Sequence, residues 1–144
     1  MPIATTIDEI RSSIVAAVRG IEPSYAPRSD ERWRVVQQRA DVPSKGLRSF
    51  FIELRNLQEE GEIYGGCALH SADLHVWCSY IGLIPAEQQV FVHRDQQDLW
   101  QALHRAQIDG APRFLKSPFE PENDEDGRLW GAHVFTASLF LPLP

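Results

Sequence analysis

Two cysteines and two histidines lie close together in the sequence, in the order Cys67-x2-His70-x4-His75-x2-Cys78. Thiolates and imidazoles are the ligands that zinc prefers, so these four residues are the first candidates for a metal site. Apolar and polar residues alternate around them, which predicts one extended strand with its ends roughly 35 Å apart at about 3.3 Å per residue. A tight turn at residues 72–73 would bring them closer, but the two pairs would then point to opposite faces. We therefore interpret them as packed or surface side chains, and keep a small cytosolic metal-binding protein or enzyme as the alternative.

An acidic segment at residues 120–127 has the spacing with which calcium-binding loops begin. The residues at that spacing are Glu122, Asp124, Asp126 and Gly127. The bidentate glutamate that closes such a loop would fall at His133, which does not bind calcium in that way, and no helices are predicted on either side. The Asp-Gly pair at the end of the segment is typical of hairpin loops, so we interpret it as a solvent-exposed turn.

No familiar catalytic or nucleotide-binding motif is present in the sequence. It lacks Gly-x-Ser-x-Gly, Gly-x-Gly-x-x-Gly and the phosphate-binding Gly-Lys-Ser/Thr. Gly65-Gly66 precedes Cys67, and we interpret the pair as the opening of a strand. The net charge of −6 argues against a non-specific grip on duplex DNA, which needs clustered basic residues. We therefore expect no enzyme, no metal and no cofactor.

A helix is predicted at the start of the sequence, from Thr5 or Thr6 to Arg19. Apolar residues recur there at helical spacing, Thr6 and Glu9 form a capping box, and Gly20 supplies a stop. Prolines interrupt residues 21–46, so we predict only a short strand or an anchor on the core near Trp33.

Strands are predicted next, near residues 47–55 and from Cys67 to Leu83, with a polar turn at residues 58–61. In the longer strand Leu74, Val76, Cys78 and Tyr80 share one face, and His75, Trp77 and Ser79 share the other.

A second helix is predicted over residues 96–107, with Asp95 as its N-cap and Leu99, Trp100, Leu103 and Ala106 as its buried stripe. A final hairpin pairs residues 113–119 with residues 129–141. The predicted order α-β-β-α-β-β corresponds to one α+β domain over residues 1–144, a mainly antiparallel sheet with two helices on one face. The sequence has no run of 18 apolar residues and no signal-peptide pattern at its start, so we expect a protein that is not inserted in a membrane.

The second half of the sequence resembles bacteriophage tail terminator proteins, also called tail-completion or head–tail joining proteins. The likeness rests on a helix with Asp98-Leu99-Trp100-x2-Leu103, a strand with Phe114, the acidic segment at residues 120–127, and a long alternating strand that begins Leu129-Trp130. The N-terminal amphipathic helix, the central strands and the element order also resemble that family. Residues 21–46 are the part that the resemblance does not cover.

Membership of this family would imply a structural virion protein of the tail and neck, assembled in the host cytoplasm. Such a protein forms a hexameric ring that caps the tail tube, ends its polymerisation and joins it to the head connector. Its expected partners are further copies of itself, the tail tube protein, the connector or head-closure protein, and genomic DNA that passes without specific binding. Another neck component, a head-closure or adaptor protein, is the alternative within the virion.

Both faces of the predicted last strand carry apolar residues. The set Leu129, Phe135, Leu139 and Leu141 is more purely apolar than the set Trp130, Thr136, Ser138 and Phe140. We therefore expect Phe135 and Leu139 to lie in the core, against Leu99 and Leu103 of the second helix. Trp130 is expected to be half exposed and is the candidate residue for contact with a neighbouring subunit.

Overall fold

The first helix begins and ends where its capping residues are. The computed structural model describes residues 6–27, 32–42, 47–81, 83–123 and 129–144. Helix α1 spans Ile7–Arg19, and the Thr6 side chain accepts a hydrogen bond of 3.2 Å from the Glu9 backbone N–H. Ile10, Ile14 and Val18 form its buried stripe, so the predicted amphipathic helix is confirmed.

A long hairpin forms the centre of the sheet. Its strands are β2 (Ser49–Tyr64) and β3 (Cys67–Tyr80), and the connection is Gly65-Gly66, with φ of 53° and 82°. Positive φ at both central residues is typical of a type I′ hairpin turn, which glycine adopts without steric cost. The turn predicted at residues 58–61 is therefore wrong: that segment continues β2, and Gly65-Gly66 makes the turn instead of opening a strand.

The described residues form a sheet of six strands in the order β1-β2-β3-β6-β4, with β5 also paired to β6. Strand β6 (Leu129–Pro142) pairs antiparallel with β3 over the whole length of β3. The short strands are β1 (Arg34–Val35), which is parallel to β2, β4 (Arg113–Lys116) and β5 (Glu120–Asn123). The predicted final hairpin is confirmed by the β4–β6 pairing.

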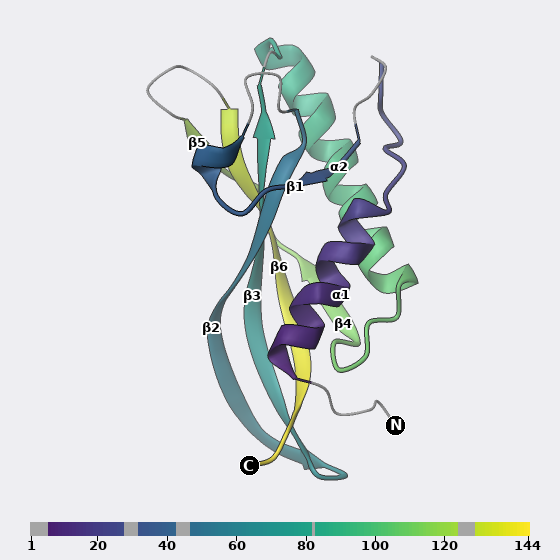
Figure 1. The fold of residues 1–144 in the computed structure, drawn as a ribbon, viewed down its shortest axis with the longest axis vertical. Helices are drawn as coiled ribbons and strands as arrows, with labels where there is room; N and C mark the ends of the chain where they lie inside the picture. Colours follow the sequence, from purple (N-terminus) through teal and green to yellow (C-terminus); the bar gives the residue numbers. More distant parts are fainter. Residues whose placement is uncertain (1–5, 28–31, 43–46, 82, 124–128) are drawn as a thin grey trace.

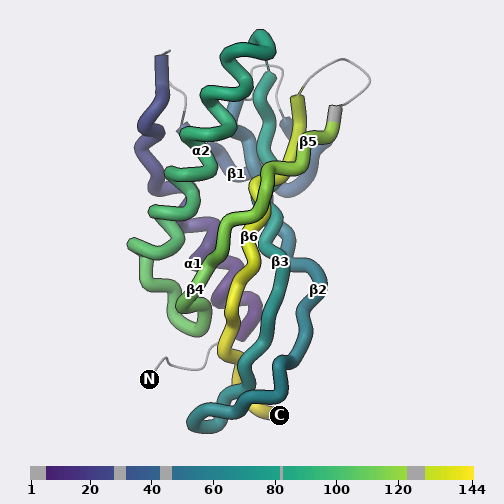
Figure 2. Tube along the Cα trace, turned by 180° about the vertical axis from the view of Figure 1, so that it is seen from behind, coloured from purple at the N-terminus to yellow at the C-terminus, as the bar shows by residue number. Residues whose placement is uncertain are grey.

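Both helices lie on the same side of the sheet, as two opposite views show (Figures 1 and 2). The core between the helices and the sheet contains Phe50, Leu74, Val76, Phe135 and Leu139, all fully buried. Trp33 is 3% exposed and packs into the same core, which confirms its predicted role as an anchor. The predicted α+β fold, with a mostly antiparallel sheet and two helices on one face, is thus confirmed.

Helix α2 spans Pro85–Arg105, so it begins about three turns earlier than predicted. Ile84 is the N-cap and Pro85 occupies the first turn, where its missing N–H leaves no helical hydrogen bond unmade. Asp95 is therefore not an N-cap but lies in the middle of the helix, fully buried. No helix in the described part of the chain is long and apolar enough to span a membrane.

The acidic segment is only in part the loop that was predicted. Residues Glu120–Asn123 form β5 and pair with β6 at Leu129–Ala132. Pairing with β6 thus outweighs the low strand propensity of this acidic segment. Asp124, Asp126 and Gly127, three of the residues at the spacing of a calcium loop, lie outside the described residues, while Glu122 accepts a hydrogen bond from Arg39.

Candidate functional site

Over most of its length the outer edge of β2 has no strand partner in the described part of the chain. Strand β1 covers only its first residues, through the pairs Arg34–Ser49 and Val35–Phe50. Beyond the bond from the Val36 N–H to the Phe50 carbonyl, no described strand pairs with this edge up to Tyr64. Unpaired N–H and C=O groups on a sheet edge are a template for pairing with another chain, so this edge is a candidate contact surface.

The far half of the β2–β3 hairpin extends beyond α1 at one end of the molecule, together with the end of β6 (Figures 1 and 2). We call residues 57–64 the arm. Every residue of the arm is exposed, and it carries apolar side chains at Leu57 (46% exposed), Ile63 (62%) and Tyr64 (49%). Three carboxylates, those of Glu59, Glu60 and Glu62, lie among them. The arm therefore combines exposed apolar area with a concentrated negative charge.

A groove opens where the unpaired edge of β2 begins. We call it the edge groove; its volume is about 460 Å³. It is lined by Arg11, Ser12, Val15, Ala16 and Arg19 of α1, by Val35, Val36 and Gln37 at β1, and by Phe51 and Ile52 of β2. The floor of the groove is apolar. Its two arginines are positively charged, whereas the arm is negatively charged.

A fully enclosed ion pair joins the residue before β2 to α2. The Arg48 guanidinium donates to both carboxylate oxygens of Asp95, at 2.7–3.1 Å, and to the Tyr25 carbonyl at 2.7 Å. Both side chains of the ion pair are completely buried. Burial lowers the pKa of Arg48, but the hydrogen bonds to Asp95 and the charge of Asp95 raise it above its usual value. Burial raises the pKa of Asp95 to about 6, against the opposing effect of Arg48.

The buried polar chain continues from Asp95 to Tyr80 and His133. The Tyr80 hydroxyl lies 2.8 Å from an Asp95 oxygen and 2.6 Å from His133 Nε2. If Tyr80 donates its one proton to the carboxylate, His133 must carry its own proton on Nε2 and donate it to Tyr80. Burial and, to a smaller extent, the charge of Arg48 lower the pKa of His133 to about 3, so the imidazole is neutral at neutral pH. All four side chains are enclosed, so this series of hydrogen-bonded groups orders the core and presents no reactive group to solvent.

The sequence contained a signal for Asp95 that the predicted N-cap obscured. Phe91, Asp95, Leu99 and Leu103 recur at intervals of four, and all four are buried on one stripe of α2. A carboxylate on an apolar stripe requires a buried partner, because an unpaired buried charge is very costly. That partner, Arg48, lies 47 residues away, and no local pattern identifies it.

The four cysteine and histidine candidates lie along one strand, as predicted. The register of β3 with β6 is continuous, so its side chains alternate strictly between the two faces. His70 and Cys78 point to the helix side, whereas Cys67 and His75 point to the opposite face. The described residues include no group of three or more side chains that could hold a metal ion.

Trp130 belongs to an aromatic cluster on the sheet face opposite the helices. Its ring stacks on Trp77 at 6.1 Å and lies 5.6 Å from Phe51, while the Arg39 guanidinium lies 5.4 Å above it. Trp130 is only 5% exposed, so the expectation of half exposure is wrong. Aromatic neighbours on β2 and β3 cover the ring, and these cross-strand partners cannot be recognised before the register is known. A contact between Trp130 and another subunit remains a prediction.

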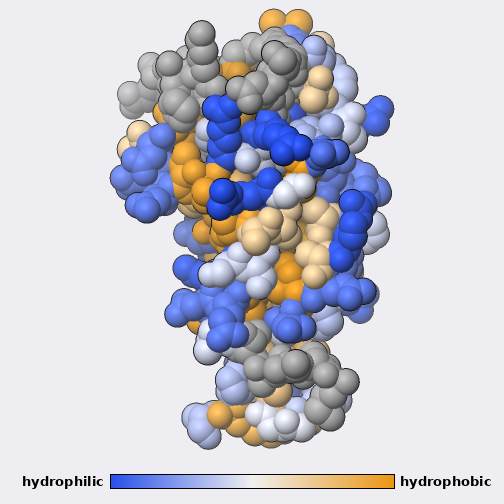
Figure 3. Space-filling view, turned by 45° about the vertical axis from the view of Figure 1, so that its right-hand side comes forward, coloured by the Kyte–Doolittle hydropathy of each residue, from blue (hydrophilic) through white to orange (hydrophobic). Residues whose placement is uncertain are grey.

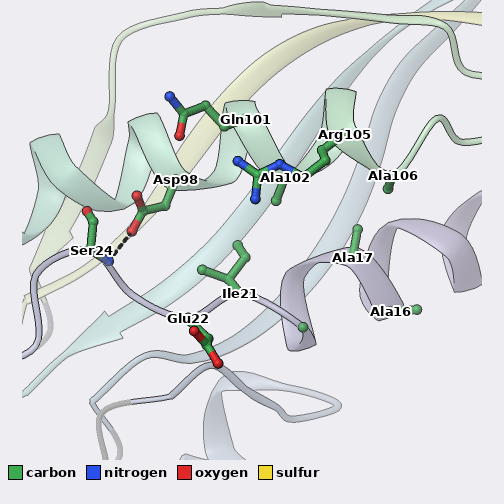
Figure 4. Close-up of a pocket in the computed structure, with 11 residues that line it drawn as sticks. Ala16, Ala17, Ile21, Glu22, Ser24, Asp98, Gln101, Ala102, Arg105 and Ala106 are labelled. Carbon is green, nitrogen blue, oxygen red and sulfur yellow. Dashed lines mark hydrogen bonds between the residues drawn. The ribbon is translucent and has the colours of Figure 1, made fainter.

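A second groove, of about 620 Å³, lies between the two helices (Figure 4). Small side chains of both helices line it, including Ala16, Ala17 and Ala102. At its far wall the Ser24 backbone N–H donates to the Asp98 carboxylate at 2.9 Å. Figure 4 shows Arg105 and Gln101 on the α2 side and Glu22 across from them, so the polar groups have mixed charge and do not define one ligand.

The sequence matches no model of a known protein family and no curated protein.

Proposed function

We propose that this chain is a bacteriophage tail terminator: a structural virion subunit that forms a hexameric ring on the tail tube, ends tube polymerisation and joins the tail to the head connector. The observation that carries the proposal is the unpaired edge of β2, continued by the projecting arm. The resemblance of the second half of the sequence to tail terminators supplies the particular role.

An exposed edge and arm suit a protein that works by assembly. Proteins normally protect long sheet edges, because unpaired edges cause uncontrolled association. Here no described strand covers the edge from Phe51 to Tyr64, which favours a specific partner. A subunit that stops polymerisation needs one contact between unlike surfaces, repeated until the ring closes, and two different axial faces. An edge on one side of the molecule and an arm at one end satisfy both needs.

The polar chemistry of the chain also favours binding over catalysis. Arg48, Asp95, Tyr80 and His133, the four titratable groups joined by hydrogen bonds in the core, are all sealed from solvent. A substrate could reach none of them without unfolding the domain. The net charge of −6 suits the wall of a channel through which DNA must slide without sticking.

The test is to mix the purified protein with tail tubes that lack a terminator, and to image the tubes by electron microscopy. We expect density at one end of each tube, six copies per end by mass, and no further elongation when free tube protein is added. Binding along the tube wall, or no binding to either end, would contradict the proposal.

The same preparation distinguishes the alternatives. A head-closure or adaptor protein would bind the portal of DNA-filled heads and leave tube ends bare. A metal protein would retain stoichiometric zinc through purification and lose it in a Cys78→Ala variant, which we do not expect.

A further inference from the structure

We propose that the arm of one copy binds in the edge groove of a second copy, so that copies associate head to tail. This inference rests on the proposed function, because it names the contact by which the ring would close. The occupant of the groove is thereby another molecule of this same chain.

The two surfaces are complementary in charge and in polarity. The arm presents Glu59, Glu60 and Glu62, and the groove presents Arg11 and Arg19, all of them exposed. Apolar side chains accompany the charges on both sides. They are Leu57, Ile63 and Tyr64 on the arm, and Val15, Val35, Val36 and Ile52 in the groove. Figure 3 shows an apolar strip bordered by strongly hydrophilic side chains on the face that carries α1.

The arm cannot fill the groove of its own chain. Residues 52 and 62 belong to the same strand, and an extended strand rises about 3.3 Å per residue, which places them roughly 30 Å apart. The groove is therefore open to a second copy. Because groove and arm are different surfaces, each contact leaves one free groove and one free arm, and further copies can be added. Such a contact gives a ring where the rotation between copies closes and a filament where it does not, and the proposed function requires closure.

Irregularities in β2 separate the arm from the run that borders the groove. The pairing with β3 shifts between Arg55 and Gln58, and again between Glu59 and Ile63. Asn56 has a φ of 57° and Gly61 a φ of 78°, as in bulged strands. Bulges bend a strand and spoil its edge for pairing, so the arm offers side chains while the regular run from Phe51 to Arg55 offers backbone groups. The contact we infer is thus specific for a partner that supplies matching side chains.

Charge exchange tests the contact. One variant reverses the groove (Arg11→Glu with Arg19→Glu), and another reverses the arm (Glu59→Lys with Glu62→Lys). Light scattering over a series of protein concentrations should show association of the wild type and loss of association in each variant alone. An equal mixture of the two variants should associate again, because each groove then meets an arm of opposite charge. The quadruple variant should also associate.

A matched pair of isoleucines controls for general surface effects. Ile63, on the arm, is 62% exposed, and Ile84, at the start of α2, is 61% exposed. We expect Ile63→Asp to leave the protein monomeric and Ile84→Asp to associate as the wild type does.

Three results would overturn the inference: a wild type that stays monomeric at every concentration, association that neither charge reversal weakens, or a mass that stops at two copies. Tube-end binding that survives both reversals would retain the proposed ring and reject this contact. Association through this contact without tube binding would retain the contact and reject the terminator role.

Discussion

At the scale of single residues, the buried chain from Arg48 to His133 organises the core. Arg48 has a φ of 58°, in the left-handed region that is uncommon for residues with a side chain. Its side chain is held by Asp95 and by the Tyr25 carbonyl, so the surrounding contacts fix the strained backbone. A buried ion pair seldom adds much stability, but removing one partner leaves an unpaired charge in the core. The pair therefore specifies how β2, β3 and α2 meet.

His133 should make the protein sensitive to acid. Burial holds the pKa of His133 at about 3, against an ordinary value of 6.5. Between these two pH values the unfolded chain therefore binds a proton that the folded chain does not bind. The free energy of unfolding should fall by roughly 1.4 kcal/mol per pH unit as the pH drops from 6.5 towards 3. The raised pKa of Asp95 acts in the opposite direction, since its folded form holds a proton between about pH 4 and 6.

A His133→Gln variant separates the two effects, because it keeps an N–H donor for Tyr80 and leaves Asp95 unchanged. Urea unfolding of both proteins at pH 7.5 and pH 4.5 should show a smaller loss of stability in the variant. Equal losses would mean that His133 titrates normally in the folded state.

The two faces of β6 provide a second test at the residue scale. Phe135 is fully buried on the helix side, so Phe135→Ala should lower the free energy of unfolding by about 3–5 kcal/mol. Trp130 is buried in its own aromatic cluster, so Trp130→Ala should also destabilise the monomer. Thr136→Ala, at the exposed position next to Phe135, is the control and should change stability by less than about 0.5 kcal/mol. Thermal melting measures all three, and a Trp130→Ala protein that melts like the control would restore the expectation of an exposed ring.

At the scale of elements, local patterns predicted those features that depend on residues close together in the sequence. The N-cap at Thr6, the alternation in β3 and the pairing of β4 with β6 are confirmed, since each depends on residues that lie close in the sequence. The length of α2 was missed because Asp95 resembles an N-cap unless its distant partner is known. The hairpin turn was misplaced because both the polar segment at residues 58–61 and Gly65-Gly66 suit a turn. The edge groove could not be predicted, since it joins α1, β1 and β2, whose relative placement no local pattern gives.

Gly131 is the point at which two elements approach too closely for a side chain. A Cβ placed there would meet the Phe119 ring and, at 2.7 Å, the Glu120 carbonyl oxygen. Gly131→Ala should therefore displace β5 and cost about 1–3 kcal/mol of stability. Gly66→Ala is the control: its φ of 82° is unfavourable for alanine, but no atom lies within 4 Å of the added carbon. Chemical denaturation compares them, and hydrogen exchange should show faster exchange of β5 amides in Gly131→Ala alone. Unchanged exchange in β5 would contradict the packing described.

At the scale of the whole molecule, the distribution of charge matters more than its sum. The net charge is −6, yet the edge groove is basic and the arm is acidic. Opposite charges on separate surfaces favour association between copies, and salt should weaken it. The excess of negative charge should also prevent non-specific binding to nucleic acid.

We expect no retardation of duplex DNA in a gel-shift measurement at physiological salt. A basic DNA-binding domain of similar size serves as the control and should retard the same fragment. Retardation by this protein that falls steeply with salt would show a phosphate-binding surface and contradict the role of an acidic channel wall that does not bind DNA.

The position of β3 in the sheet has a consequence during synthesis on the ribosome. One edge of β3 pairs with β2, which precedes it directly in the chain, but the other pairs with β6, about 50 residues later. A nascent chain that has grown only as far as α2 therefore contains the hairpin with a bare second edge. Cooperative folding must wait until residue 142 has left the exit tunnel, and until then the growing chain is open to strand exchange with its neighbours on the same messenger RNA.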